Sequence, residues 1–311
     1  MGNDLSFFVL LARLESFTAT GRELGISASA VSRRLVKLED RLGVRLLHRT
    51  TRRVSLTSEG DAYLLEAERI LGDIDALEQR ITGARDTPKG LLRINSTLRF
   101  GRTFIAPAIS TFKQRYPEVE VQLLLTDAPL NLVKEGVDLG IRFGAPPDSR
   151  MVLRLLVRNR RYLCAAPSYL SRRGFPATLG DLQEHNCIVL RQDHGAYDIW
   201  RFDDRNGDMP TAKVGGDLST NDGEIALDWV LGGHGIMLRS EWDIASHVRQ
   251  GNLRIVLPNY RQSAHLSAVY PERHNLSAKV RRFVDHLADT LKETGRSAPL
   301  TLSPKYLETR P

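Results

Sequence analysis

The hydrophobic pattern at the start of the chain predicts three short helices. Apolar residues at helical spacing predict helices over residues 4–14 and 17–24, and Gly25 supplies a left-handed end for the second. A third helix follows, and either Ser27 or Ser29 caps it. Its apolar positions recur at intervals of four, three and four residues: Val31, Leu35, Leu38 and Leu42. The third helix therefore buries one face and leaves the opposite face to polar side chains.

The polar face of the third helix carries short hydroxyls and long cations. These side chains are Ser29, Ser32, Arg33, Arg34 and Lys37. Arginine can pair with guanine in the major groove of DNA, and serine can reach a base edge or a phosphate. A solvated amphipathic helix is the alternative interpretation. The turn at residues 24–27 joins two short helices and favours a helix-turn-helix that binds DNA.

Residues 44–56 place apolar positions on both sides of a basic tip, which predicts a β-hairpin. Such a hairpin is the wing of a winged helix, and Arg52 and Arg53 at its tip can reach the minor groove or its phosphates. Charge supports DNA binding, because residues 22–53 contain nine basic and three acidic residues. The N-terminal sixty residues are thus predicted to form a winged helix-turn-helix domain.

A long helix is predicted from residue 57 to about residue 85. Its apolar residues follow a heptad spacing: Ile70, Ile74, Leu77 and Ile81. Packing of this stripe on its own domain is one possibility. A unit of sixty residues buries little apolar surface alone, so a second copy of the chain is the favoured partner. We expect residues 61–90 to form a dimerisation helix that ends in a Pro-Gly hinge at 86–90.

From residue 91 the pattern changes to alternating strands and helices, which predicts a parallel sheet with crossover helices. The first elements are strands over 91–95, 119–126 and 137–143, and helices over 103–115 and 130–134. Residues 153–165 read as extended chain that leaves this subdomain. A second subdomain follows to about residue 258, and a strand at 265–270 and a helix at 277–291 return to the first. The residues after 294 are polar and proline-bearing, so 296–311 are predicted to be a disordered tail.

Polar residues at strand ends and helix starts are candidates for binding a small molecule. They are Ser96, Thr97, Thr126, Arg142, Asn221 and His234. Arg142 suggests a small carboxylate as the ligand. Each has a structural alternative: Ser96 and Asn221 can simply cap helices, His234 can belong to a tight turn, and Arg142 can be an outward charge on its strand.

Composition bounds the function. The chain has 311 residues, 41% hydrophobic and 26% charged, with a net charge of +7. Its apolar runs are too short to span a bilayer, and no signal peptide is recognisable, so we expect no membrane partner and a cytoplasmic location. Two cysteines, Cys164 and Cys187, fit a reducing compartment, and a redox pair between them is a weak possibility. No catalytic or metal-binding motif is recognisable, so we expect no enzyme, cofactor or metal site.

Residues 16–60, and most closely AVSRRLVKLEDRLGVRLLHRTTRRVSLTSEG, resemble the DNA-binding domain of LysR-type transcriptional regulators. The likeness continues more loosely to about residue 293. It implies that Thr18 contacts the DNA backbone, that the polar residues of the third helix face bases and phosphates, and that Arg52 and Arg53 serve the wing. Ala28 and Ala30 replace larger residues found in many members, so the base preference does not carry over.

The resemblance also implies the architecture. It consists of a winged helix-turn-helix (1–60), a linker helix (61–90) and a two-lobed α/β effector domain like periplasmic binding proteins (91–295). Lobe 1 would comprise about 91–161 and 267–293, and lobe 2 about 162–266. The implied partners are double-stranded operator DNA, an effector between the lobes, further copies in a dimer or tetramer, and RNA polymerase. The implied location is the bacterial nucleoid. The competing classes are a solute-binding protein, an enzyme on the same scaffold, and an architectural DNA-binding protein without a ligand.

Overall fold

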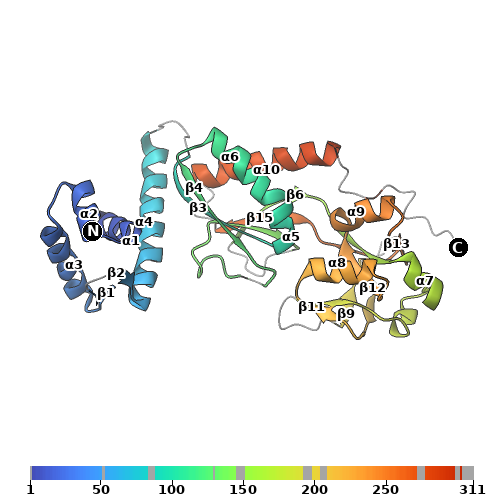
Figure 1. The fold of residues 1–311 in the computed structure, drawn as a ribbon. Coiled ribbons are helices and arrows are strands. Elements are labelled where there is room, and N and C mark those ends of the chain that lie inside the picture. Colours follow the sequence, from blue (N-terminus) through green and yellow to red (C-terminus); the bar gives the residue numbers. More distant parts are fainter. Residues whose placement is uncertain are drawn as a thin grey trace. The chain divides into compact units, whose positions relative to one another are not determined.

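The computed structural model describes residues 2–50, 53–82, 88–128, 130–144, 151–191, 198–203, 209–271, 277–297 and 302. The chain divides into two compact units, residues 1–87 and 88–311 (Figure 1). None of the helices in the described ranges is both long enough and apolar enough to cross a membrane.

Unit 1 contains the three predicted helices, a hairpin and a long helix. Their bounds are α1 (Gly2–Leu14), α2 (Phe17–Leu24), α3 (Ala28–Leu42), β1 (Leu47–Thr50), β2 (Arg53–Leu56) and α4 (Ser58–Thr82). Gly25 adopts the expected left-handed conformation, with φ of 67°. The cap of α3 is Ser27, whose Oγ accepts from the Ala30 amide, and not Ser29. Three helices and the winged hairpin confirm the predicted helix-turn-helix fold.

The core of unit 1 joins the helices to the wing. Its buried members are Phe7, Phe8, Leu11, Val31, Leu35, Leu38, Leu46 and Leu47. From α4, Tyr63 and Leu64 pack against this core, and the Tyr63 ring lies edge-on to Phe8 at 5.2 Å. A Cβ at Gly60 would stand 2.0 Å from the carbonyl oxygen of Leu46, so glycine lets α4 start against the wing. The first turns of α4 are therefore part of the winged-helix fold.

Unit 2 begins with lobe 1, defined here by the five-stranded sheet and the helices that cover it. The strand order is β4-β3-β5-β15-β6. Their bounds are β3 (Gly90–Ser96), β4 (Val119–Leu125), β5 (Leu139–Phe143), β6 (Met151–Val157) and β15 (Leu266–Pro271). β3 is parallel to β4 and β5, but β15 is antiparallel to β5 and β6. The parallel pairing predicted for the first three strands is thus confirmed, and β15, which enters from lobe 2 in the opposite direction, adds the antiparallel pairs.

Helices α6 (Ala106–Arg115) and α10 (Ala278–Ser297) pack beside each other on lobe 1 (Figure 1). The rings of Phe112 and Phe283 meet edge-on at 5.1 Å in this contact. The predicted helix start at Thr103 is wrong. The helical segment begins at Leu98 with α5 (Leu98–Phe100) and continues through a π-turn, η1 (Gly101–Ile105).

A second local prediction is also wrong, since residues 130–134 form a turn and not a helix. The Asn131 side chain accepts the Lys134 amide at 3.0 Å. Gly136 follows with φ of 61°, a left-handed conformation that ends the turn. Strand β5 consequently starts at Leu139 rather than at residue 137.

Lobe 2 is built around β7 (Arg160–Ala165), which pairs antiparallel with β12 (Ile236–Ser240), β13 (Arg254–Ile255) and β14 (Arg261–Ser263). Two small pairs complete its strands: β8 (Val189–Leu190) with β11 (Ser219–Thr220), and β9 (Ile199–Arg201) with β10 (Thr211–Lys213). The helices are α7 (Pro167–Arg173), η2 (Gly180–Gln183), α8 (Gly223–Leu231) and α9 (Glu241–Arg249). Alternate residues of β7 enter two apolar cores, one on each face of its sheet.

Two chain segments connect the lobes: residues 158–159 lead from β6 to β7, and residues 264–265 lead from β14 to β15. The buried Asn159 joins them, because its Nδ2 donates to the Ala264 carbonyl at 2.8 Å and its carbonyl accepts the Ala264 amide at 3.1 Å. The chain thus leaves lobe 1 after β6, and β15 and α10 belong to the sheet and core of lobe 1.

The predicted disordered tail needs correction in the part that the structure describes. Helix α10 runs to Ser297, beyond the predicted start at 296. Leu302 is buried in a core of lobe 2. Burial of its apolar side chain stabilises this position of the chain. The other residues of 298–311 lie outside the described ranges.

Candidate DNA-binding surface and effector site

The recognition face of α3 presents the expected side chains to solvent. Ser29, Ser32, Arg33 and Lys37 are exposed, as is Thr18 on α2. Val31, Leu35 and Leu38 on the opposite face are buried. The helical stripe read from the sequence therefore fixes which side chains of α3 face solvent, and their contact with DNA stays a prediction.

Arg34 departs from the predicted exposed face. Its side chain retains 27% of its exposure, and its guanidinium carbon lies 4.4 Å from the centre of the Phe7 ring. Its Nη2 is 3.7 Å from Asp4 Oδ1. A cation over an aromatic face beside a carboxylate ties α3 to α1. Contact of Arg34 with DNA stays a prediction, and the side chain has this structural role besides.

The wing hairpin pairs Thr50 with Arg53 at its tip. Arg53 therefore belongs to β2, while its side chain and Arg52 lie outside the described part, so their contacts with DNA stay predictions. The base of the wing is held by Glu39 of α3, which is 2% exposed. Its carboxylate accepts the Leu46 amide at 2.9 Å, the Leu47 amide at 3.3 Å and Arg45 Nη1 at 2.7 Å.

We expect Glu39→Ala to destabilise unit 1 by about 2–4 kcal/mol, because two buried amides would lose their acceptor. Burial alone would raise the pKa of Glu39, but the hydrogen bonds from Leu46, Arg45 and Leu47 outweigh it and lower the pKa below its ordinary 4.5. A lowered pKa means that the stabilisation is complete above pH 4.5 and is lost as pH falls through the folded-state value. Thermal unfolding at pH 7 and pH 3 measures both effects. An unchanged melting temperature for the variant at pH 7 would contradict this role, and Glu23→Ala on the exposed surface of α2 is the control.

The proposed dimerisation stripe on α4 is partly open in the single chain. Ile70 is half-buried, and Ile74 and Leu77 remain 37% and 46% exposed. The side chain of Ile81 lies outside the described part. Ala67, one turn before Ile70, is buried. The apolar residues of α4 thus become more exposed toward the C-terminal end of the helix, which is compatible with a partner helix that covers them. Dimerisation through it stays a prediction.

A cavity of about 180 Å³ lies between the lobes of unit 2. It is lined by residues of both lobes: Thr97, Arg99, Asp127, Phe143, Arg161, Ile188, Leu190, Ile199, Trp200, Gly223, Leu238, Arg239, Ser240, Trp242 and Gln262. The lining includes three arginines but one carboxylate. The cavity therefore has an excess of positive charge among its wall residues.

Arg161 is the least compensated of these arginines. Its Nη1 donates to Gln262 Oε1 at 3.0 Å, and no carboxylate of the described residues lies within 4 Å of it. Burial, with the neighbouring Arg239, lowers the pKa of Arg161 to about 10. At neutral pH the guanidinium of Arg161 is still charged, and no carboxylate of the described residues balances its charge.

Arg142, on the side of lobe 1, is a second arginine whose charged form is disfavoured by burial. Burial lowers its pKa, and the negative charge of Asp127 opposes that shift. Its Nη2 is buried without a partner among the described residues, as is the Oγ of Ser96. The Arg142 Nη1 reaches the carbonyl of Thr126 at 3.5 Å, and the Thr126 amide donates to the Ser96 carbonyl at 3.0 Å. These three predicted residues therefore meet at one end of the sheet, but none of them lines the cavity.

Asp127, which sequence reasoning did not select, lies at the start of α5. Its Oδ1 accepts the Leu98 amide at 3.0 Å, at the first residue of α5. Burial raises the pKa of Asp127, and Leu98, Arg239 and Arg142 counteract the shift. Thr97 lines the cavity and is the N-cap residue of α5, but its side chain makes no capping hydrogen bond.

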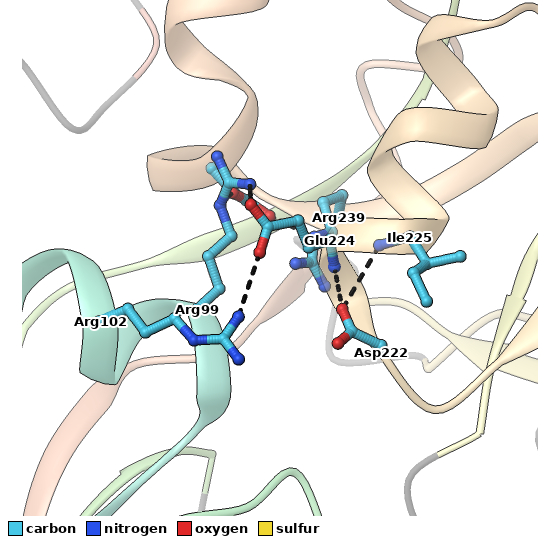
Figure 2. Close-up of polar contacts among 7 residues, drawn as sticks. Arg99, Arg102, Asp222, Glu224, Ile225 and Arg239 are labelled. Atoms are coloured by element: carbon cyan, nitrogen blue, oxygen red, sulfur yellow. Dashed lines mark hydrogen bonds and ion pairs between the residues drawn. The ribbon is translucent and has the colours of Figure 1, made fainter.

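An ion-pair cluster crosses from lobe 1 to lobe 2 at the cavity wall (Figure 2). Glu224 accepts from Arg99 Nη1 at 3.2 Å and from Arg102 Nη1 at 3.4 Å. Arg99 also reaches the buried Asp243, with 2.6 Å between Nε and Oδ1. Arg239 pairs with the other oxygen of Asp243.

The guanidinium of Arg239 rests on the backbone at the start of α8. A Cβ added to Gly223 would lie 2.3 Å from Arg239 Nη2, so a side chain there would displace the guanidinium. Asp222 caps α8, accepting the Glu224 amide at 2.7 Å and the Ile225 amide at 3.3 Å. The cap confirms the expected helix start near Asn221.

The two predicted effector residues of lobe 2 also lie outside the lining of the cavity. Asn221 is exposed and does not line the interlobe cavity. His234 is exposed and lines a separate open depression within lobe 2, beside Arg172 and His185. Gly233 adopts φ of 77°, so the structure supports the tight-turn alternative for this segment. Their binding of an effector is not supported by their position.

Comparison with known protein families decides the identity. The model of the bacterial regulatory helix-turn-helix protein, lysR family, matches residues 3–61, and that of the LysR substrate binding domain matches residues 85–292. The chain belongs to the LysR family. Members of the LysR family bind DNA and small-molecule effectors and form oligomers, so this chain is a DNA-binding transcription regulator.

Curated relatives agree with the LysR assignment. The chain is 42% identical over 292 residues to the HTH-type transcriptional regulator DmlR of Escherichia coli, covering 94% of each chain. It is 39% identical over 289 residues to the HTH-type transcriptional activator TtdR of Escherichia coli, covering 93% of each. Both are named as regulators, which argues against the enzyme and solute-binding alternatives.

The solved structure of CrgA, a LysR-type transcriptional regulator from Neisseria meningitidis, shares the fold. Sequence identity is 30%, the TM-score is 0.58, and the match covers 93% of this chain and 98% of that one. The predicted architecture of a winged helix-turn-helix, a linker helix and a two-lobed effector domain is thus confirmed.

The chemistry of the two cysteines of this LysR-family chain argues against a redox pair. Both are free and buried, and burial raises the pKa of each thiol to about 12. A thiol that stays protonated at neutral pH is a poor nucleophile. Within the described ranges, no group of three or more His, Cys, Asp or Glu side chains could hold a metal ion.

Proposed function

We propose that this LysR-family regulator binds a small carboxylate in the interlobe cavity, and that the bound carboxylate alters promoter binding. The observation that carries the proposal is Arg161, a desolvated guanidinium with an amide oxygen as its recorded partner. Buried charges are stabilised by an opposite charge, and a carboxylate matches the planar fork of arginine. Arg142 and Ser96 of lobe 1 carry further unpartnered donors; neither lines the cavity, but Arg142 interacts electrostatically with Asp127, which does.

Thermal unfolding of the full chain with acetate, succinate, citrate and benzoate tests the proposal. A ligand at about 100 times its Kd adds about 2.7 kcal/mol, which would raise the melting temperature of the effector domain by roughly 5–10 °C. The matching neutral amides should give no shift. If no carboxylate stabilises the protein beyond its amide, the proposed ligand class is wrong.

Arg161→Met is expected to weaken binding of the active carboxylate by about 10- to 100-fold, because a charge-assisted hydrogen bond is lost. Arg254→Met is the matched control, since Arg254 is exposed on β13 of the same lobe and does not line the cavity. Isothermal titration gives both affinities. Equal affinities for the two variants would show that the carboxylate does not bind at Arg161.

We also propose a dimer formed through α4, with tetramers built by a further contact between effector domains. The exposed Ile74 and Leu77 support the first contact. A regulator that binds promoter DNA acts where the chromosome lies, so the proposed location is the bacterial nucleoid in the cytoplasm. RNA polymerase is the proposed partner at the promoter, and size-exclusion chromatography with light scattering tests the oligomer.

A further inference from the structure

Three consecutive residues at the start of α9 contact three different parts of unit 2. Asp243 is fully buried and lies between two arginines of the cavity wall. Arg99 comes from α5 of lobe 1, and Arg239 comes from β12 of lobe 2. A single carboxylate therefore fixes one cation from each lobe, and removing it would leave both without this partner.

Trp242 joins the same turn to the aromatic side chains of lobe 1. Its ring lies 5.3 Å from Phe100 and 5.7 Å from Phe104, both edge-on, and is stacked 6.0 Å from Phe143. Trp242 and Phe143 also line the interlobe cavity. The first turn of α9 is thus packed on lobe 1 although the rest of its helix belongs to lobe 2.

Glu241 ties this turn to the crossing segment and to the end of the chain. Its Oε1 accepts the Arg160 amide at 3.2 Å, directly after the segment that leads from lobe 1 to lobe 2. Its Oε2 accepts the Leu302 amide at 3.4 Å. The Leu302 side chain is buried in the lobe 2 core that also contains Ile244 of α9.

Leu302 follows the last residue of α10 by five positions, and α10 packs on lobe 1. The polypeptide therefore joins the lobes a third time, after the two segments at Asn159 and Ala264. Glu241 contacts the first and the third of these connections. A shift of α9 relative to lobe 1 must change these contacts together, because the three residues are adjacent in one helical turn.

We propose that the first turn of α9 couples the cavity wall to the C-terminal end of the chain. Asp243 is a positioning residue that holds Arg99 and Arg239, and Glu241 carries a change in their position to Arg160 and to the docking of Leu302. The proposal goes beyond the proposed function, since it requires no particular effector.

Hydrogen exchange of the full-length protein, followed by mass spectrometry, tests the coupling. Arg99→Gln removes the lobe 1 cation from Asp243 without touching Glu241 or Leu302. We expect amide exchange to rise roughly fivefold in the peptides that contain Arg160 and Leu302. Because coupling is reciprocal, Leu302→Ala should raise exchange in the peptide that contains Arg99.

Arg154→Gln is the matched control, since it breaks an Arg–Asp ion pair of the same 2.6 Å length within lobe 1. It should leave the Arg160 and Leu302 peptides unchanged, and Arg99→Lys should restore part of the protection lost in Arg99→Gln. The proposal is overturned if Arg99→Gln changes exchange only around residues 98–102 and 239–243, or if Arg154→Gln has the same remote effect. Should Arg99→Gln fail to fold, a chain ending at Ser297 removes residues 298–311 and with them the docked Leu302, and unchanged exchange at Arg99 in that chain would equally overturn the coupling.

Discussion

Binding of the full-length protein to duplex DNA is expected to weaken by at least about 10³-fold when salt rises from 50 to 200 mM. Two copies of α3 and the wing would together neutralise six or more phosphates, and each neutralised phosphate releases condensed counterions. The exposed cations Arg33 and Lys37 lie on the recognition face. Fluorescence anisotropy across a salt series gives the slope.

The double variant Arg33→Ala, Lys37→Ala should lower that slope by about two for each protomer bound. Arg254→Ala, far along the chain in lobe 2, serves as the control and should keep the original slope. Affinity that stays flat between low and moderate salt would argue against DNA binding through this basic surface.

Replacing Ile74 and Leu77 together with aspartate is expected to convert the dimer to monomers, with a dimer Kd raised by at least about 100-fold. Both side chains are substantially exposed in the single chain, so an α4–α4 contact would bury them, and a buried unpaired carboxylate costs several kcal/mol. Sedimentation equilibrium measures the change. The same variant should lose most of its DNA affinity, because a monomer binds one half-site.

Glu66→Lys and Glu68→Lys, which change charge on α4 without entering the apolar stripe, form the control pair. Unchanged assembly of the Ile74→Asp, Leu77→Asp variant would place dimerisation elsewhere. Normal thermal stability of unit 1 in that variant would show that the effect is on assembly, since Tyr63 and Leu64 carry the contact of α4 with the domain core.

The winged helix was predictable because its determinants are local. Caps at Ser16 and Gly25 and the apolar stripe on α3, of which Val31, Leu35 and Leu38 are buried, define the helix-turn-helix within thirty residues. Arg34 is the exception, because its orientation depends on Phe7 and Asp4 of another helix. Periodicity assigns a side chain to a face, but it does not report which neighbouring helix overlaps the edge of that face.

The candidate effector site was only partly predictable because it depends on long-range pairing. Thr97 and Arg142 follow or end strands that the alternating pattern revealed. Arg161 was missed because it starts a strand, and the rule for parallel sheets selects residues at strand ends. β7 and β12 are antiparallel, so Arg161 pairs with Ser240 and lies beside Arg239 at the same sheet edge.

The position of β15 has a consequence for how the chain is made. This strand lies between β5 and β6, yet it is translated after the whole of lobe 2. During translation, lobe 2 is a continuous segment that can fold before β15 is made. Until then, β5 and β6 lack the strand that pairs with both of them. Unpaired strand edges recruit other chains, so a transcript truncated before codon 266 would yield a product prone to aggregation even though its DNA-binding unit is complete.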